Sequence, residues 1–149
     1  KRVTTAAGIP LIINDSVDIC LKSGADGVHV GQGDMAAGEV RRLLGPDKIL
    51  GVSARTVEQA LAAQKAGADY LGVGAMFGTS TKLDAKKTSL EAVSIPVVAI
   101  GGVREENLLS LSGSGADGAA VVSAIFAQKD ICRAAKRLRD LSDQMVAGK

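Results

Sequence analysis

Short apolar runs alternate with amphipathic segments along the chain, and one phrase, Gly-Ala-Asp, stands before three of the runs. Its copies begin at residues 24, 67 and 115, so each interval is about two strand-plus-helix units long. Glycine tolerates the left-handed backbone at the end of a helix, and the aspartate can bond the backbone of the turn. The copies therefore predict repeated corners where a helix gives way to a buried strand.

The apolar pattern predicts six strands and six helices in alternation. The strands are expected at residues 10–14, 27–30, 49–53, 70–74, 96–101 and 118–123. The helices are expected at residues 17–22, 35–44, 57–66, 88–93, 105–112 and 131–145, and residues 1–7 should end a further helix. Alternation of this kind is typical of right-handed βαβ units and a parallel sheet.

The predicted fold class is α/β, and a TIM (β/α)8 barrel accommodates such units most naturally. Six strands do not close a barrel of that shear, so the first two βα units are expected to be missing from residues 1–149. The chain would then be a single, N-terminally incomplete barrel domain. An open, doubly wound six-stranded sheet is the alternative. Both folds place the ligand at the carboxyl ends of the strands.

Composition narrows the choice of partners. The chain has 149 residues, 46% of them hydrophobic, and a net charge of +2, which predicts a well-buried core and no nucleic-acid surface. No stretch is apolar enough to cross a bilayer, so no membrane partner is expected. Cys20 and Cys132 match neither a metal site nor a redox pair. We expect two buried thiols in a reducing compartment, the cytoplasm.

Acidic residues follow two neighbouring predicted strands. Asn14 and Asp15 end the first strand, and Asp34 follows the second. Carboxylates from adjacent strand ends can share a hard cation such as Mg²⁺, which keeps several waters and is often completed by substrate phosphate. The alternative is that Asp15 and Asp34 each cap the helix that follows. Their pairing favours the metal site.

The last two predicted strands end in groups that suit an anion. Gly101 and Gly102 can expose backbone N–H groups, and Ser123 adds a donor at the next strand end. In a barrel these are the last strands, where phosphate sites commonly form. Two ordinary turns are the alternative. The adjacency of the two corners favours a phosphate site.

A long polar loop and two strand residues complete the candidate chemistry. Residues 79–82 carry three hydroxyls and the Lys82 ammonium, which can stabilise a departing anion. Thr56 forms its own capping box with Gln59, so Ser53 is available to a ligand. His29, the single histidine, is expected to be a hydrogen-bonded core residue rather than a catalyst.

From Pro10 to the C-terminal helix the chain resembles the thiamine phosphate synthase family. The most specific segment is Gly24-Ala25-Asp26-Gly27-Val28-His29-Val30-Gly31-Gln32 with Asp34. Further matching segments lie at residues 10–15, 43–46 with 51–53, 67–74, 79–82, 97–102 and 121–125. The resemblance implies a TIM barrel that joins an aminopyrimidine methyl diphosphate to a thiazole ethyl phosphate and releases diphosphate. The implied route is dissociative and assisted by Mg²⁺.

The resemblance also assigns roles to individual residues. It implies that Asp15 and Asp34 hold Mg²⁺, and that Asn14 and Ser53 contact the pyrimidine diphosphate, whose leaving group Lys82 binds. The implied contacts of the thiazole partner are Thr79, Ser80 and Thr81 for its body, and Gly102, Val122 and Ser123 for its phosphate. In this scheme Lys82 and Ser53 carry the catalytic roles.

The chain departs from the family pattern in three places. The family's second strand, with a Gln, an Arg and a Lys that grip the diphosphate, has no counterpart in this sequence. Residues 84–95 are shorter than the family's usual helix, and Gly78 replaces a usual proline. These departures keep two alternatives open. One is a thiazole tautomerase-like isomerase, a group that tends to carry a histidine where Ser53 stands. The other is a non-catalytic, phosphate-binding partial barrel, whose open strand edges would need a partner segment, another chain or a swap, so that a homo-oligomer is one expectation.

Overall fold

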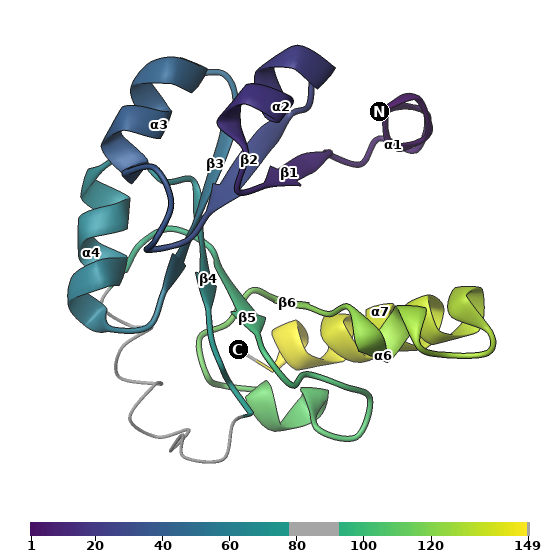
Figure 1. The fold of residues 1–149 in the computed structure, drawn as a ribbon. Coiled ribbons are helices and arrows are strands. Elements are labelled where there is room, and N and C mark those ends of the chain that lie inside the picture. Colours follow the sequence, from purple (N-terminus) through teal and green to yellow (C-terminus); the bar gives the residue numbers. More distant parts are fainter. Residues whose placement is uncertain (78–92, 149) are drawn as a thin grey trace. The chain divides into compact units, whose positions relative to one another are not determined.

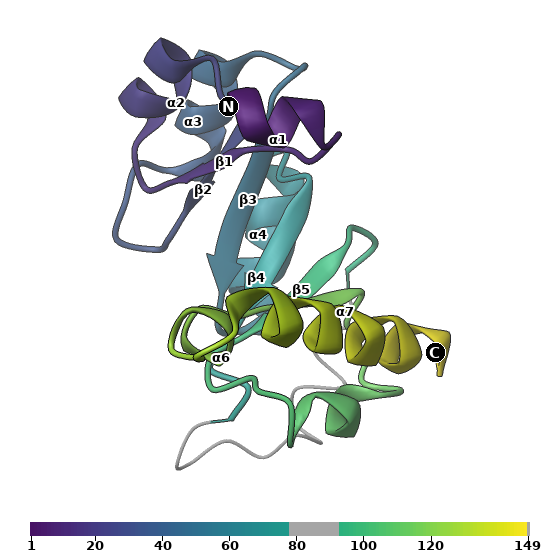
Figure 2. The same ribbon diagram turned by 90° about the vertical axis from the view of Figure 1, so that its right-hand side faces the viewer.

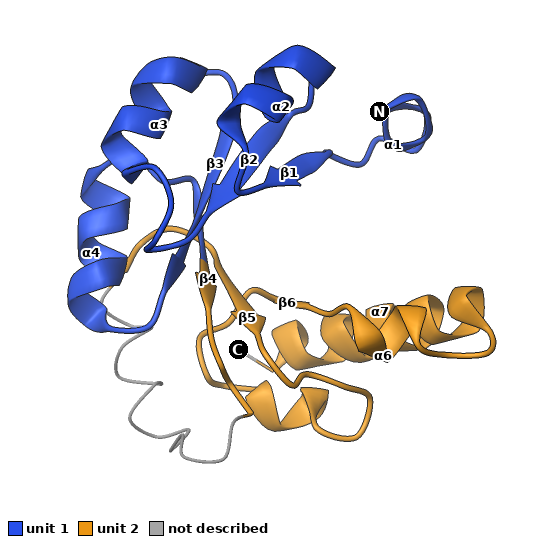
Figure 3. Cartoon of the chain, in the orientation of Figure 1, with its two compact units in different colours: residues 1–71 blue, residues 72–149 orange. Residues whose placement is uncertain are grey.

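The computed structural model describes residues 1–77 and 93–148, and its contacts group the chain into two compact units, residues 1–71 and 72–149 (Figure 3). Most of the helix expected at residues 88–93 lies outside the described residues. Among the described residues, no helix has the length and apolar character needed to cross a membrane.

The first unit is a parallel sheet with helices on one face (Figures 1 and 2). Strand β1 pairs with β2, and β2 pairs with β3, all in parallel. The order of the strands in the sheet therefore follows their order in the chain. Helices α2, α3 and α4 cover the same face of these strands. The elements are α1 (Arg2–Ala6), β1 (Ile12–Asn14), α2 (Val17–Ser23), β2 (Gly27–Val30), α3 (Ala37–Leu44), β3 (Ile49–Ala54), α4 (Val57–Lys65) and β4 (Tyr70–Val73).

Strand β4 crosses the boundary, and the second unit continues the order as β4-β5-β6. The C-terminal helix packs against the 3₁₀ helix, the short helix before it and the last strand. The elements are β5 (Val97–Ile100), η1 (Leu108–Leu111), β6 (Gly118–Ala120), α6 (Ser123–Phe126) and α7 (Ile131–Ala147).

The expected α/β class is confirmed, and the doubly wound alternative is wrong. A doubly wound sheet reverses its strand order at a switch point, whereas the strands within each unit follow chain order without reversal. The parallel strands and their helices are consistent with part of a TIM-like barrel. The absence of the first two βα units stays a prediction, as does the single domain.

Two predicted elements are corrected near the C-terminus. The last strand ends at Ala120 rather than at Ser123, because the backbone turns at Val122, whose carbonyl accepts bonds from Ile125 and Phe126 in α6. The α-helix expected at residues 105–112 is a 3₁₀ turn, η1. Before it, the Asn107 side chain accepts a bond from the Arg104 backbone at 2.8 Å, which favours a turn over a regular helix.

The three Gly-Ala-Asp corners share a reciprocal pair of hydrogen bonds, which we call the aspartate clamp. In each clamp the aspartate backbone N–H donates to a carbonyl at the start of the neighbouring strand. The same neighbour's N–H donates back to the aspartate carboxylate. The pairs are Asp26 with Leu11, Asp69 with Leu50 and Asp117 with Val97, with N···Oδ2 distances of 2.7, 2.7 and 2.8 Å.

The clamps confirm the predicted corners and correct the aspartate's expected partner. Gly24, Gly67 and Gly115 all have positive φ, as the end of a helix requires. The carboxylates, however, bond the neighbouring strand instead of their own turn. Each clamp thereby fixes the register of one parallel strand pair, β1/β2, β3/β4 or β5/β6, at its N-terminal edge.

The core consists of strand side chains and one face of each of the helices α2, α3, α4 and α7. Val28, Leu50 and Leu71 are completely buried in β2, β3 and β4. Cys20 is buried as expected, but the prediction for Cys132 is wrong, because this thiol is exposed. Helix α7 buries Leu138, Leu141 and Met145 on one face, and Cys132 lies on the opposite side of the helix at a period of 3.6 residues.

Candidate active site

The carboxyl end of β1 exposes the two polar residues predicted there. Asn14 lies opposite His29 in the parallel register, and the Asp15 N–H donates to the His29 carbonyl at 2.8 Å. Both polar side chains are exposed. Asp15 has a φ of +66°, in the left-handed region that is uncommon for residues other than glycine, although aspartate adopts it more readily than most. Residues held in this region cluster at functional sites, so the strain supports a role for Asp15 beyond the turn.

Neither Asp15 nor Asp34 caps a helix, so the capping alternative is wrong for both. Ser16 caps α2, with its hydroxyl accepting from the Ile19 N–H at 3.2 Å. Helix α3 begins after Ala36, which has no side-chain cap. The Asp34 carboxylate instead accepts from the Gly31 N–H at 2.6 Å and closes the loop after β2. Neither carboxylate is therefore used to start a helix, and both retain lone pairs that can bind a ligand.

The two carboxylates act on one imidazole. Burial lowers the pKa of His29, and the negative charges of Asp15 and Asp34 both oppose that shift. Among the described residues, no group of three or more His, Cys, Asp or Glu side chains is arranged to hold a metal ion. The predicted Mg²⁺ site therefore offers two carboxylates, Asp15 and Asp34, and not a full set of protein ligands. Mg²⁺ is commonly held by one or two carboxylates, with waters and substrate phosphates completing its octahedron, and the exposed Asp15 and Asp34 suit that pattern.

His29 joins two other side chains in one hydrogen-bonded chain, as its expected core role requires. Its Nδ1 lies 3.0 Å from the Tyr70 Oη, and its Nε2 lies 2.9 Å from the Ser53 Oγ. All three residues are half-buried. Burial raises the pKa of Tyr70, so its phenol stays protonated at neutral pH. This Tyr70–His29–Ser53 chain crosses β2, β3 and β4.

Glycine at position 51 makes room for this chain. A Cβ there would lie 2.2 Å from the Tyr70 Cζ and 2.4 Å from the His29 Nδ1, so any side chain would displace both rings. Gln32 also reaches the site and donates to the Ser53 carbonyl at 2.7 Å. Sequence reasoning assigned no role to Tyr70, and it placed Gln32 at a strand end without giving it a partner. For Tyr70, the glycine inside an apolar strand was a local signal of a close approach.

The predicted availability of Ser53 is confirmed in part. Thr56 does cap α4, with its hydroxyl accepting from the Gln59 N–H at 3.3 Å, so Ser53 is not needed there. The Ser53 hydroxyl is nevertheless hydrogen-bonded to His29. A hydroxyl has one proton and two lone pairs, so it can bind His29 and a ligand at once.

In the second unit, Gly101 and Gly102 form a backbone corner after β5. Their φ values are +94° and +71°, and a Cβ on Gly102 would lie 2.6 Å from the Phe77 carbonyl oxygen. The Asn107 side chain donates to the Gly102 carbonyl at 2.9 Å and so holds the corner. Asn107 was not predicted from the sequence, since its partner is a backbone atom.

The predicted phosphate residues line one pocket. A hollow of about 630 Å³ in the second unit is bordered by Gly102, Val122 and Ser123. Val122 and Ser123 are exposed, and Ser123 is the first residue of α6. The structure thus brings the glycine corner and Ser123 to the same pocket, as the predicted phosphate site requires.

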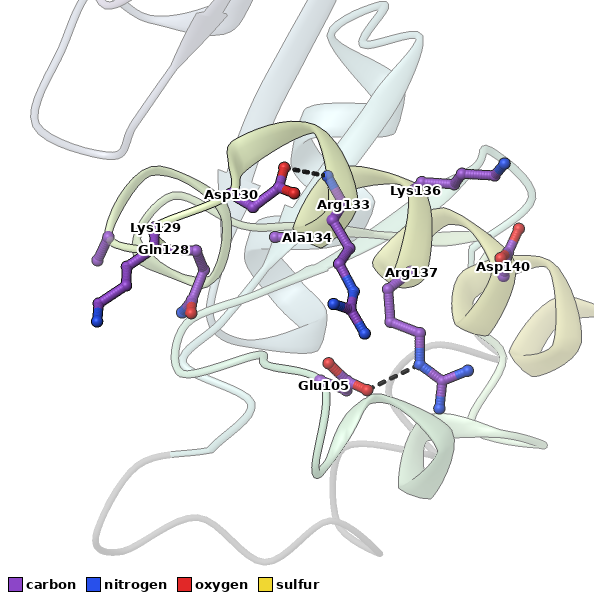
Figure 4. A pocket seen from close by; sticks show the side chains of 10 residues that line it. Glu105, Gln128, Lys129, Asp130, Arg133, Ala134, Lys136, Arg137 and Asp140 are labelled. Atoms are coloured by element: carbon purple, nitrogen blue, oxygen red, sulfur yellow. Dashed lines mark hydrogen bonds and ion pairs between the residues drawn. The ribbon is translucent and has the colours of Figure 1, made fainter.

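A second, more charged pocket of about 800 Å³ lies beside the start of α7 (Figure 4). Two of its acidic groups already have structural partners. Asp130 caps α7 by accepting from the Arg133 N–H at 2.9 Å, and Glu105 pairs with Arg137 at 2.7 Å. The predicted phosphate residues Gly102, Val122 and Ser123 line the smaller pocket and not this one.

The remaining predicted site residues, Thr79, Ser80, Thr81 and Lys82, lie outside the described residues. Their assigned contacts stay predictions.

Comparison with known proteins identifies relatives that match most of the chain. A family model described as thiamine monophosphate synthase matches residues 1–125. A thiamine-phosphate synthase of Ruminiclostridium cellulolyticum is 56% identical, over 95% of this chain and 70% of the relative. One of Chloroflexus aurantiacus is 50% identical, over 95% of this chain and 68% of the relative.

Solved structures agree with the sequence relatives. Thiamine phosphate pyrophosphorylase from Pyrococcus furiosus matches with a TM-score of 0.90 and 36% identity, over 97% of this chain and 73% of that one. A 3-hexulose-6-phosphate synthase matches with a TM-score of 0.72 and 21% identity, over 94% of this chain and 77% of that one, which shows a shared fold alone. The sequence matches and the Pyrococcus structure confirm the resemblance seen in the motifs: the chain belongs to the thiamine monophosphate synthase family.

Proposed function

We propose that the chain joins an aminopyrimidine methyl diphosphate to a thiazole ethyl phosphate, giving thiamine phosphate and diphosphate. Its relatives make it a transferase of thiamine biosynthesis, a thiamine-phosphate synthase. The observation that carries the finer proposal is the pair Asp15 and Asp34. Both stand at neighbouring strand ends, and neither is used to cap a helix.

Asp15 and Asp34 would hold Mg²⁺ in this reaction. When bound, the ion supplies positive charge that offsets the charge of the diphosphate. Asp15 supplies an exposed carboxylate on a strained backbone, whereas the bond from Gly31 fixes the orientation of Asp34. Ligands held on short, pinned loops lose little freedom on binding, which favours a preorganised site.

The pyrimidine diphosphate would be held by Asn14 and Ser53, with Lys82 on its leaving group. In the dissociative route, the bond between the pyrimidine methylene carbon and the diphosphate oxygen breaks, and both electrons leave with diphosphate. The thiazole nitrogen then forms a bond to the pyrimidinylmethyl cation with its lone pair. Charge stabilisation of the departing diphosphate is the main task, and alignment of the two rings is the second.

The thiazole partner would be bound through its phosphate by Gly102, Val122 and Ser123, with Thr79, Ser80 and Thr81 on its body. Support for the phosphate site comes from the shared pocket and from the glycine corner, where two successive glycines have positive φ values. Cytoplasmic location and a homo-oligomeric state are further proposals from the sequence.

The test is product formation from the two phosphorylated precursors with and without Mg²⁺. Thiamine phosphate and diphosphate should appear in equal amounts, and Asp15→Asn should abolish their formation. Asp18→Asn is the matched control, because Asp18 is an exposed acid that pairs with Lys22 on the same helix, α2. Rearrangement of the thiazole phosphate without pyrimidine consumption would instead identify a tautomerase. Binding of either phosphate without any product would identify a non-catalytic protein.

A further inference from the structure

The hydrogen-bonded chain through His29 has a direction that affects how Ser53 meets a ligand. A neutral imidazole has one N–H donor and one bare nitrogen acceptor. If Tyr70 donates to Nδ1, then Nε2 carries the proton and donates to the Ser53 Oγ. If the chain runs the other way, Ser53 donates its only proton to Nε2. The two directions therefore leave Ser53 as a donor or as an acceptor toward a ligand.

The surroundings of Tyr70 favour the first direction. No other hydrogen bond to its hydroxyl is found among the described residues, so His29 Nδ1 is the acceptor available to its proton. A phenol is a better proton donor than an aliphatic hydroxyl, because its pKa is near 10. The bond from Tyr70 to imidazole is therefore the stronger of the two possible O–H···N bonds.

Packing holds the two rings in this relation. The centroids of His29 and Tyr70 are 5.4 Å apart, and both rings occupy the space over Gly51 that a side chain would fill. Ser53 lies near the carboxyl end of β3, and its carbonyl is bonded by Gln32. The serine backbone is thus fixed, whereas its hydroxyl proton can still rotate.

We propose that Tyr70 is a positioning residue, which holds His29 in the Nε2–H tautomer so that Ser53 presents its O–H as a donor to the ligand. The identity of that ligand, the pyrimidine diphosphate, rests on the proposed function. The direction of the hydrogen-bonded chain does not. Ser53 accepts from His29 Nε2–H and donates to an acceptor atom of the diphosphate substrate, which an anionic ligand requires.

The direction is tested by nitrogen NMR of histidine-labelled protein purified without a histidine tag. The chain has one histidine, so the ring signals need no assignment to a residue and only Nδ1 and Nε2 have to be told apart. At a pH well above the ordinary histidine pKa of 6.5, Nδ1 should give an unprotonated signal and Nε2 a protonated one. Ser53→Ala should keep that pattern, whereas Tyr70→Phe should shift it toward the other tautomer. A protonated Nδ1 in the unmodified protein would overturn the proposal.

The consequence for the ligand is tested by a double-mutant cycle on kcat/KM for the pyrimidine diphosphate. Ser53→Ala and Tyr70→Phe should each lower it about three- to tenfold, the range of one hydrogen bond. Since Tyr70 acts through Ser53, the double variant should be no worse than Ser53→Ala alone. Multiplied losses in the double variant would mean that Tyr70 acts only through packing, and would overturn the proposal.

Circular dichroism and thermal unfolding are measured on every variant, because Tyr70 is half-buried. Should Tyr70→Phe not fold, the NMR comparison of the unmodified protein with Ser53→Ala still decides the direction. The NMR result does not depend on turnover. Protein that makes thiamine phosphate but carries a protonated Nδ1 would refute this inference and leave the proposed function standing, whereas the predicted tautomer without any product would do the reverse.

Discussion

Aspartates stand at both ends of the strands, and the two sets differ in what binds their carboxylates. At the strand starts, Asp26, Asp69 and Asp117 each accept a backbone N–H of the neighbouring strand. At the strand ends, Asp34 accepts one N–H within its own loop. The Asp15 side chain has no hydrogen bond or ion pair among the described residues.

This difference separates stabilising from functional acids of the same chemical type. A carboxylate that accepts the N–H of a neighbouring strand contributes to folding, since its loss leaves a strand N–H without a partner. A carboxylate left open, on a strained backbone, contributes little to folding and is available to a cation. Loss of an aspartate is thus expected to lower stability at the starts of the strands and to lower activity at their ends.

The largest expected effect comes from an acid at a strand end. Asp34→Asn keeps an oxygen acceptor for the Gly31 N–H but removes the negative charge. We expect Mg²⁺-dependent turnover to fall on the order of 100-fold or more, with an unchanged melting temperature. Steady-state rates across a Mg²⁺ titration measure this. Unaltered turnover would place Asp34 with the structural acids.

The next effect concerns an acid at a strand start. Asp69→Ala removes the acceptor of the Leu50 N–H and the partner of Arg41, whose Nη2 lies 2.5 Å from the carboxylate. We expect the free energy of unfolding to fall by about 2 kcal/mol, measured in urea. Asp69→Asn retains an acceptor and should lose less. Equal losses would mean that the Leu50 bond does not matter.

The comparison extends to the second unit, where a glycine occupies the strand end. Gly102→Ala introduces a side chain at a φ of +71° and a Cβ near the Phe77 carbonyl. We expect a loss of about 1 to 2 kcal/mol in unfolding free energy. KM for the thiazole phosphate should rise while KM for the pyrimidine diphosphate is retained. A rise in both would show that the corner is not specific to one substrate.

The smallest effect is a pH dependence at the first clamp. The bond from the Leu11 N–H, and next the bond from Lys1, lower the pKa of Asp26 below its ordinary 3.8. The folded state therefore binds this proton less readily than the unfolded state. The stabilisation is complete above pH 3.8 and is lost as the pH falls through the lower folded-state pKa. Asp26→Asn should remove this part of the acid dependence of unfolding, and an identical acid profile would contradict it.

The positions of strands and corners could be predicted because the signals are local. Apolar runs and Gly-Ala-Asp phrases gave the start of β2, β3 and β4 to the residue. The strand expected at residues 118–123 was too long, since Val121 and Val122 are apolar but follow the last sheet residue. Apolar character alone does not distinguish a strand from the turn that follows it.

The site was only partly predictable because its contacts join distant positions. Asn14, Asp15 and Asp34 follow apolar strands, and that pattern is visible in the sequence. The capping alternative could not be excluded there, since Ser16 beside Asp15 is an equally good cap and only the structure shows which one bonds Ile19. The contact between Tyr70 and His29 depends on the register of the strands, which cannot be determined from the sequence alone.

The aspartate clamp also defines the modules from which this protein can be rebuilt. The clamps join β1 to β2, β3 to β4 and β5 to β6. A segment of two consecutive strands is therefore the smallest piece that contains a complete clamp. In a chimera with a relative, a crossover point placed between Val30 and Ile49 keeps each clamp aspartate and the strand that it bonds in the same parent sequence. An exchange between Asn14 and Gly27 would separate the first such pair, so grafting and circular permutation should succeed at the former junction more readily than at the latter.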